Sequence, residues 1–202
     1  DFADGVAARF GASQDLSISH DGTNSYINEL GTGDLVIQTN GNKIGLASSS
    51  PFEWMVEAVT NGAVTLSHDG SAKLATTSTG VDVTGELIAD SYNETYAAVT
   101  STSNATTVDC HNGNSFSHAL TENTTFTFSN PPSSGTSYTF SLKIIQDASA
   151  SGFTVTWPAA VDWPTATAPT LTATASAVDY FVFTTHDGGT TWYGFTAGQA
   201  LG

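Results

Sequence analysis

Residues 138–144 read Tyr-Thr-Phe-Ser-Leu-Lys-Ile, a strict alternation of apolar and polar side chains. Residues 125–128 (TFTF) show the same period of two. This period places alternate side chains on opposite faces of a β-strand. In residues 178–183 aromatic side chains fall on both faces, so we expect a central strand with Tyr180 packed inward. These stretches together predict an all-β chain.

The second half of the sequence predicts a β-sandwich. Turn residues separate its apolar runs, as in 130–135 (NPPSSG) and 187–189 (DGG). About seven short strands with turns between them are typical of a sandwich, and we expect a jelly-roll-like one. The predicted strands cover residues 106–110, 115–120, 124–128, 137–146, 152–157, 177–185 and 190–196.

The first half predicts shorter strands. Residues 52–58 (FEWMVEA) alternate with a period of two, which favours a strand. A helix is the competing interpretation, because Glu53 and Glu57 are four residues apart. The Asn61-Gly62 pair that follows is a strong hairpin signal, since both residues tolerate positive φ. We therefore prefer the strand, and we expect residues 52–58 to pack inward.

A weak internal repeat suggests a shaft. Residues 16–22 (LSISHDG) resemble residues 64–70 (VTLSHDG), 48 positions later. Repeats of this length suggest β units stacked along an axis. Residues 79–90 look like an extended connector, and residues 97–107 are rich in Ala, Thr, Ser and Asn. We predict a β-repeat shaft with its connector over residues 1–96 and a sandwich head over residues 97–202.

The charge balance excludes several classes of partner. Lys and Arg number 4 against 19 Asp and Glu, giving a formal net charge of -15 in 202 residues. A nucleic-acid binder needs many cations to neutralise phosphates, and so does a protein docked on anionic lipid. No apolar stretch is long enough to span a bilayer, so membrane insertion is not predicted. One Cys allows no internal disulfide. The chain does not begin with Met, and we interpret it as the ordered part of a longer protein.

Residues 115–196 resemble a domain found near the C-terminus of many bacteriophage tail-fibre and virion structural proteins. The resemblance is carried by four phrases in the second half of the chain: residues 125–132 (TFTFSNPP), 155–163 (VTWPAAVDW), 168–171 (APTL) and 187–195 (DGGTTWYGF). Residues 15–90 are similar to the repeat segments of phage fibres, where a connector like residues 79–87 (TGVDVTGEL) leads to the distal head.

This resemblance implies a non-catalytic virion protein, the distal part of a tail fibre or similar appendage. It implies a homotrimer, attached to other virion proteins through a preceding N-terminal part and in contact with host surface polysaccharide. Trimerisation would also cover the edges and apolar faces of a thin β shaft. The alternatives are a head-decoration or capsid fibre protein without a receptor, and a secreted carbohydrate-binding module. An enzyme acting on polysaccharide is a further hypothesis.

The candidate reactive groups favour structural roles. Three His-Asp-Gly tripeptides, beginning at residues 20, 68 and 186, are typical of turns, where Asp accepts backbone N–H bonds. Cys110 and His111 are consecutive, whereas a thiol nucleophile needs a base that faces it. The glutamates are scattered, so no catalytic pair is predicted. Residues 109–114 (DCHNGN) offer oxygen ligands for Ca²⁺ but lack the spacing of a known calcium loop. We predict no catalytic residue, metal site or cofactor.

Aromatic side chains provide the candidate ligand site. Trp157, Trp163, Trp192 and Tyr193 lie in the resemblance region, and aromatic rings stack on sugar rings. We expect Trp157 and Trp192 to fill the core, because large aromatic side chains are mostly buried. Trp163 and Tyr193 are the candidate glycan-binding residues.

Overall fold

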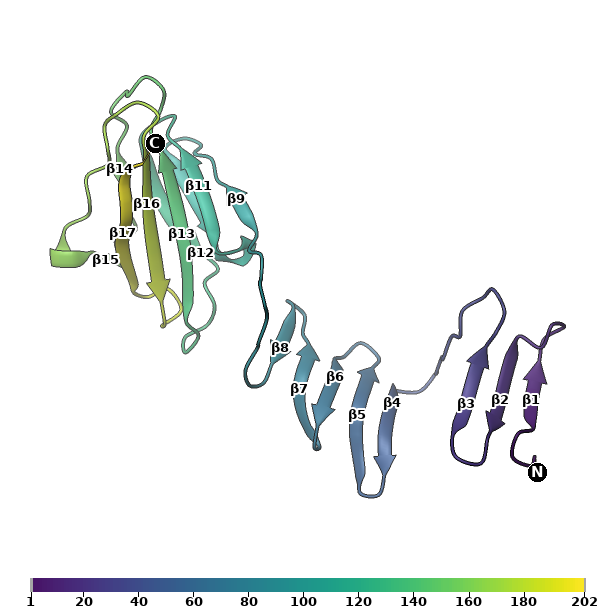
Figure 1. Ribbon diagram of the computed structural model, residues 1–202. Helices are drawn as coiled ribbons and strands as arrows, with labels where there is room; N and C mark the ends of the chain where they lie inside the picture. Colours follow the sequence, from purple (N-terminus) through teal and green to yellow (C-terminus); the bar gives the residue numbers. More distant parts are fainter. Residues whose placement is uncertain (1, 202) are drawn as a thin grey trace. The chain divides into compact units, whose positions relative to one another are not determined.

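The computed structural model describes residues 2–201, which divide into two compact units, residues 2–89 and residues 90–201. Almost all of the regular structure is β-strand (Figure 1), which confirms the predicted all-β fold. The second unit begins at Asp90 rather than at the predicted residue 97. The predicted boundary cuts through β9 (Tyr96–Ala98), which pairs with β11 (Ser115–Ala119) of the second unit. Residue 96 therefore belongs to the C-terminal unit.

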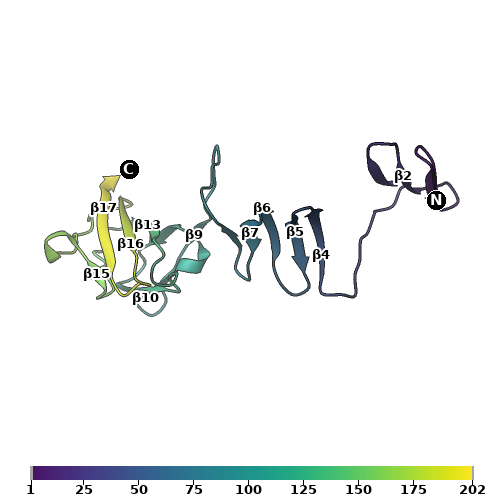
Figure 2. The same cartoon turned by 90° about the horizontal axis from the view of Figure 1, so that it is seen from below.

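The first unit contains two antiparallel sheets. β1 (Ala7–Phe10), β2 (Leu16–His20) and β3 (Ser25–Glu29) form a three-stranded sheet in sequence order. The second sheet has five strands, also in sequence order, and is a single layer (Figure 2). Its strands are β4 (Lys43–Ser49), β5 (Phe52–Val59), β6 (Val64–His68), β7 (Ser71–Thr76) and β8 (Val81–Val83).

The predicted strand over residues 52–58 is confirmed as β5, and the helix interpretation is wrong. β5 and β6 form the predicted hairpin, but its loop holds three residues, because the Val59 N–H donates to the carbonyl of Ala63. Of the Asn61-Gly62 pair, only Asn61 has positive φ. The expectation that this strand packs inward is wrong: none of residues 52–58 is buried, and Phe52 is 63% exposed.

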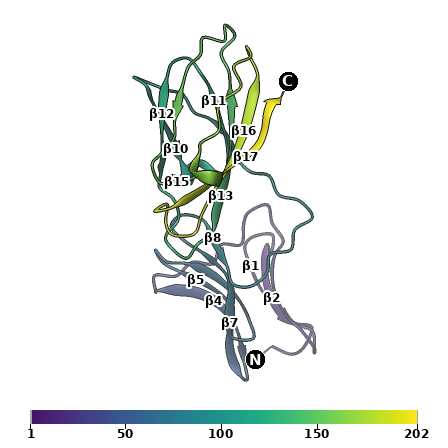
Figure 3. The same ribbon diagram turned by 90° about the vertical axis from the view of Figure 1, so that its left-hand side faces the viewer.

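The second unit is built from two sheets (Figure 3). The larger sheet has the order β15-β17-β16-β13-β11-β9, and the smaller one β10-β12-β14. The predicted strands are found with shifts of a few residues at their ends. Besides β9 and β11, the strands are β10 (Ala105–Asp109), β12 (Thr124–Ser129), β13 (Tyr138–Ile145), β14 (Val155–Thr156), β15 (Val161–Asp162), β16 (Val178–Thr185) and β17 (Trp192–Leu201).

The connectivity of this unit differs from a jelly roll, whose sheets are antiparallel. From β9 to β15, successive strands alternate between the two sheets. The neighbours within each sheet are consequently parallel: β9 with β11, β11 with β13, β10 with β12, and β12 with β14. This part of the chain therefore winds like a short two-sheet coil. Antiparallel β16 and β17 then extend the larger sheet beyond β13.

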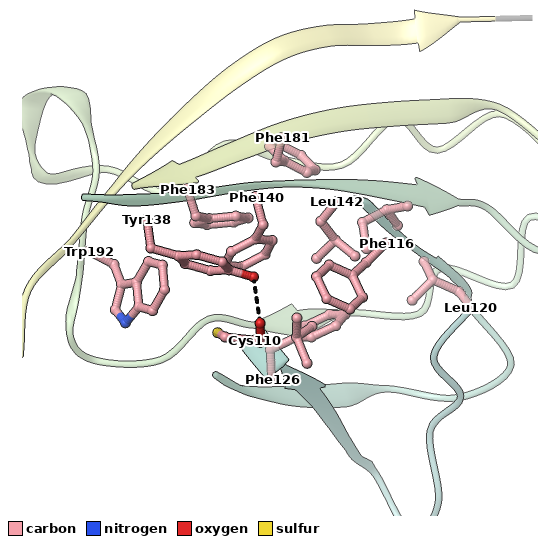
Figure 4. Close-up of a cluster of buried hydrophobic side chains, with 12 residues drawn as sticks. Cys110, Phe116, Leu120, Phe126, Tyr138, Phe140, Leu142, Phe181, Phe183 and Trp192 are labelled. Carbon is pink, nitrogen blue, oxygen red and sulfur yellow. Dashed lines mark hydrogen bonds between the residues drawn. The ribbon is translucent and has the colours of Figure 1, made fainter. Parts of the chain in front are cut away.

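The hydrophobic core lies between these two sheets. Phe128 of β12 contacts Phe140 of β13 and Phe183 of β16, with ring centroids 4.9 Å apart in each pair. Figure 4 shows the aromatic side chains of the larger sheet directed toward the smaller one. The buried apolar side chains are Val108, Cys110, Phe116, Leu120, Phe126, Tyr138, Phe140, Leu142, Ile144, Phe181, Phe183 and Trp192.

β16 is a central strand, as predicted, but the expected position of Tyr180 is wrong. Phe181 and Phe183 are fully buried, whereas Tyr180 is half-buried on the opposite face. Because aromatic side chains occupy both faces of this strand, its sequence alone could not show which face meets the smaller sheet. The side chains that pack across the core from the smaller sheet decide which face of β16 is buried.

Candidate functional site

The two predicted glycan-binding residues lie on opposite faces of the six-stranded sheet. Along β17, Trp192 and Gly194 point into the core, whereas Tyr193 and Phe195 point outward. A Cβ on Gly194 would lie 2.9 Å from the Trp163 ring, so Trp163 packs directly over this glycine. The indole of Trp163 is therefore on the core side, and Tyr193 is not part of the same surface.

Trp163 belongs to the edge of the core aromatic cluster. Its ring centroid lies 5.4 Å from that of Trp157 and 5.6 Å from that of Phe183. Trp157 in turn stacks on Phe126 at 5.3 Å. Trp192 is buried as predicted, and Trp157 is partly buried against the core. In these contacts, other protein side chains cover the indole ring of Trp157.

The outward face of the six-stranded sheet carries the exposed aromatic side chains of the second unit. Tyr193 is 46% exposed and Phe195 is 49% exposed. In the strand register, Phe195 lies opposite Val182, which lies opposite Ser141 of β13. Ser141 lies opposite Ser115 of β11, and Ser115 opposite Tyr96 of β9, 57% exposed. We call this surface the outer face.

Hydroxyl groups link neighbouring strands across the outer face. The Thr139 hydroxyl donates to the Thr184 hydroxyl at 2.8 Å, which joins β13 to β16. The hydroxyls of Ser141 and Tyr180 are 3.3 Å apart. The Tyr96 and Ser117 hydroxyls also form a hydrogen bond, which joins β9 to β11. The outer face thus combines ring faces with hydroxyl donors and acceptors.

Sequence reasoning identified Tyr193 but missed Phe195 and Tyr96. Phe195 has the same parity as Tyr193 on one strand, so the alternation of residues 192–195 could have found it. Tyr96 had no such local signal. Only the pairing of β9 with β11 brings it onto this sheet.

The His-Asp-Gly tripeptides are turns, as predicted, but they are not equivalent. Asp21 accepts the N–H groups of Asn24 and Thr23. The bond from Asn24 contributes most to lowering the pKa of its carboxyl group, followed by the bond from the Tyr26 hydroxyl. Asp69 and Gly70 instead form a two-residue hairpin turn between paired His68 and Ser71. Both central residues of this turn have positive φ, as a type I′ turn requires.

The third tripeptide closes the loop between β16 and β17. The Asp187 carboxylate accepts the Thr191 N–H at 3.0 Å and the Thr185 hydroxyl at 2.9 Å. The hydrogen bond from the Thr191 backbone contributes most to lowering the pKa of this carboxyl group. Each of these bonds holds a loop in place.

The lone thiol is structural, as predicted. Cys110 is buried in the core, and burial raises the pKa of its thiol to about 11. It is therefore protonated at neutral pH, whereas the thiolate is the nucleophile. The Tyr138 hydroxyl donates to the Cys110 carbonyl at 3.1 Å (Figure 4), which ties the end of β10 to β13.

The oxygen ligands considered for Ca²⁺ have protein partners. Asp109 accepts the Asn130 side-chain amide and the His111 N–H, each at 3.0 Å, and the Asn130 bond contributes most to lowering its pKa. Asn114 donates its amide to the Thr139 carbonyl. Within residues 2–201, no three His, Cys, Asp or Glu side chains are grouped as metal ligands. The same residues contain no helix of the length and apolarity needed to cross a membrane.

Comparison with known proteins identifies no relative. No family model, no curated protein and no solved structure matches this chain.

Proposed function

We propose that this chain is a non-catalytic structural subunit that assembles with identical copies through residues 7–83. We further propose that it presents residues 90–202 to a host surface glycan, as the distal part of a phage tail fibre or similar appendage. The sequence resemblance supports the fibre and its virion location. A specific structural observation supports the self-assembly, namely an apolar sheet face that no part of the first unit covers.

One face of the five-stranded sheet is aliphatic from edge to edge. In the strand register, Leu46 lies opposite Val56, Val56 opposite Leu66, Leu66 opposite Leu74, and Leu74 opposite Val83. One row of apolar side chains therefore crosses all five strands. Leu46 is 61% exposed and Leu66 is 43% exposed.

A second apolar row runs beside the first on the same face. Ile44, Ala58 and Val64 are paired across β4, β5 and β6. The opposite face carries charged groups and one aromatic ring. Glu57 lies opposite Thr65 on β6 and forms a salt bridge with Lys43 at 2.6 Å. The Trp54 ring lies on this face against Gly45, with its centroid 4.0 Å from the Lys43 Nζ. The sheet is therefore amphipathic, with an aliphatic face defined by these two rows.

The three-stranded sheet repeats this arrangement. Ala8, Ile18 and Ile27 are paired across its three strands, and Phe10 lies opposite Leu16 on the same face. The internal sequence repeat thus marks strands β2 and β6, each of which contributes to an apolar face. Among residues 2–89, only Ser17 is buried.

An uncovered aliphatic sheet cannot stabilise itself in water. Burying a Leu or Val side chain contributes about 1.5–3 kcal/mol, and ordering each residue costs about as much. A region that lacks buried apolar side chains therefore needs a partner in order to fold, and such obligate partners are most often identical subunits. Three copies are what the fibre resemblance implies.

The molar mass in solution tests this proposal. Light scattering after size exclusion should give about three times 20.9 kDa for the 202-residue chain. Leu66→Lys, on the aliphatic face, should reduce the mass to that of one copy. The matched control is Thr65→Lys, whose side chain lies on the opposite face beside Glu57, and it should leave the assembly intact.

Two results would contradict the proposal in different ways. A mass of two copies would exclude the trimer but keep self-assembly through the aliphatic face. A monomer at every concentration, with slowly exchanging amides in residues 43–83, would exclude self-assembly altogether. A head-decoration protein or a secreted carbohydrate-binding module would then be the better hypothesis.

A further inference from the structure

We propose that the outer face of the six-stranded sheet binds a neutral saccharide chain that lies along β13 and over Lys143. This inference refines the glycan contact of the proposed function and rests on it. The inference rests on two hollows in this face, on the lysine between them and on the net charge of the chain.

The first hollow has a volume of about 300 Å³ and lies toward the start of β13. Tyr92, Glu94, Asn114 and Ser141 contribute to its lining. Tyr92 is 79% exposed, so its ring is free to meet a ligand. The hollow therefore offers an aromatic ring together with carboxylate, amide and hydroxyl groups, which accept and donate hydrogen bonds.

The second hollow also has a volume of about 300 Å³ and lies toward the end of β13. Ser101, Ser117, Thr121 and Ile145 are among the residues that line it. Its lining is more apolar than that of the first hollow and includes several hydroxyl groups. Each hollow falls in the size range of small-ligand sites, which is about 300–1,000 Å³.

Lys143 lies between the two hollows. Ser141, Lys143 and Ile145 are successive outward residues of β13, so one strand leads from the first hollow to the second. Residues two apart on a strand are separated by about 6.8 Å, so Ser141 and Ile145 are roughly 14 Å apart. That distance suits a short oligosaccharide that bridges both hollows.

The ammonium group of Lys143 has no anionic partner. Its Nζ lies 5.8 Å from the centroid of the Tyr96 ring, and it forms no salt bridge with any residue in 2–201. It is the single Lys or Arg in residues 90–202. An ammonium group has three N–H donors, and here they are free to bind hydroxyl or ring oxygens.

The side chains of the outer face indicate which class of ligand it binds. Aromatic rings bind the apolar faces of sugars, and the surrounding hydroxyl, amide and ammonium groups bind their oxygens. One lysine in a chain of formal net charge -15 cannot offset the repulsion of a polyanion. The ligand is therefore a neutral, hydroxyl-rich chain rather than an acidic polysaccharide.

A glycan array tests the inference with the complete 202-residue chain. The array carries neutral and uronate-containing oligosaccharides of bacterial surfaces. We expect retention by at least one neutral oligosaccharide, whose affinity is then measured by calorimetry. Lys143→Met keeps the apolar stem but removes the donors, and Tyr92→Ala removes an exposed ring. Each should weaken binding at least tenfold.

Lys73→Met is the matched control, because Lys73 lies on β7 of the first unit. It should leave the affinity unchanged. Tryptophan fluorescence, to which buried Trp192 contributes, reports whether each variant is folded. Unchanged affinity in folded Lys143→Met and Tyr92→Ala would overturn the inference, and so would retention by uronate-containing oligosaccharides alone.

Failure of this inference is distinguishable from failure of the proposed assembly. If the chain has the mass of a trimer but no array oligosaccharide retains it, the saccharide site is wrong and the structural role stands. If the chain is a monomer but a neutral oligosaccharide binds with the expected variant effects, the site stands and the assembly is wrong.

Discussion

Residues 2–89 and residues 90–201 share one strand pattern, but they bury their apolar side chains to different extents. In both regions apolar and polar side chains alternate along short strands. In the second region two sheets enclose the apolar side chains, so that Phe140, Leu142 and Phe183 have almost no exposed surface. In the first region, apolar side chains such as those of Leu46 and Ile27 remain largely exposed. A period of two therefore predicts a strand without predicting what covers it.

Connectivity explains this difference. In the first unit, consecutive strands are neighbours in one sheet, so each sheet grows as a single layer. In the second unit, consecutive strands from β9 to β15 alternate between two sheets, so a second layer forms as the chain proceeds. We propose that the aliphatic face of the first unit is covered by another copy of the chain.

The largest expected effect concerns the enclosed core. Phe183 contacts Phe128, Phe140 and two tryptophans, and its side chain is fully buried. Phe183→Ala should lower the free energy of unfolding of the second unit by about 3–5 kcal/mol, because it removes buried surface and leaves a cavity. Urea unfolding followed by tryptophan fluorescence measures this change. Phe195→Ala, on the outer face, is the control and should cost less than about 1 kcal/mol. Similar costs for both would contradict the assigned faces.

A buried carboxylate should make the second unit sensitive to acid. The Asp179 carboxylate accepts bonds from the Thr172 hydroxyl and N–H at 2.7 Å and from the Ala200 N–H at 3.1 Å. Burial alone would raise the pKa of Asp179, but these bonds, with one from Gln199, outweigh it and hold the pKa below 3.8. The stabilisation is therefore present above the unfolded pKa and is lost as pH falls through the lower native pKa.

Asp179→Asn should accordingly cost about 1–3 kcal/mol near neutral pH, because its amide would face N–H donors. Urea unfolding at about pH 7 and about pH 3 measures the cost, which should shrink at the lower pH. A cost that does not vary with pH would show that the carboxylate charge does not stabilise this contact.

Dilution should change hydrogen exchange in the first region but not in the second. Each tenfold dilution weakens one association step by about 1.4 kcal/mol, so amides in residues 43–83 should exchange faster as the assembly dissociates. Amides of β13 should be unaffected, because the core of that unit lies within one copy. Hydrogen exchange across a dilution series measures both. Equal responses in the two regions would mean that the second unit also depends on assembly.

The smallest expected effect concerns a turn in the first unit. Gly70 has a φ of +67°, and a Cβ there would have no atom within 4 Å. Gly70→Ala should therefore destabilise the assembled protein through backbone strain alone, by about 1 kcal/mol. Gly33→Ala is the control, since Gly33 has equally open surroundings and no positive φ. Thermal unfolding of the two assembled variants compares them, and equal melting temperatures would contradict the type I′ turn.

Much of the secondary structure could be predicted from local sequence. The alternation in residues 138–144 predicted β13, and the alternation in residues 52–58 predicted β5 against a helical alternative. The His-Asp-Gly tripeptides were correctly interpreted as turns, because Asp and Gly act through their own neighbouring backbone. Trp192 was correctly placed in the core. Each of these features depends on residues close together in the chain.

The surfaces could not be predicted in the same way, because each depends on which strands become neighbours. Tyr180 and Phe181 are equally suited to a core, and only the position of the smaller sheet decides that Phe181 is buried. Trp163 and Tyr193 appeared to be equivalent sugar-stacking candidates, but the pairing of β15 with β17 puts them on opposite faces. Tyr96 reached the outer face through a parallel pairing that no local pattern indicates.

Local sequence is therefore enough to show that this protein is built of strands, where most of them lie, and how its turns are made. These properties follow from side-chain alternation and from the backbone preferences of Gly, Asn and Asp, which act over a few residues. Contacts in the folded chain are needed to show that each sheet of the first region is a single layer with an uncovered aliphatic face. They are also needed to show that the second region encloses its core, because layering depends on contacts between strands that are distant in sequence.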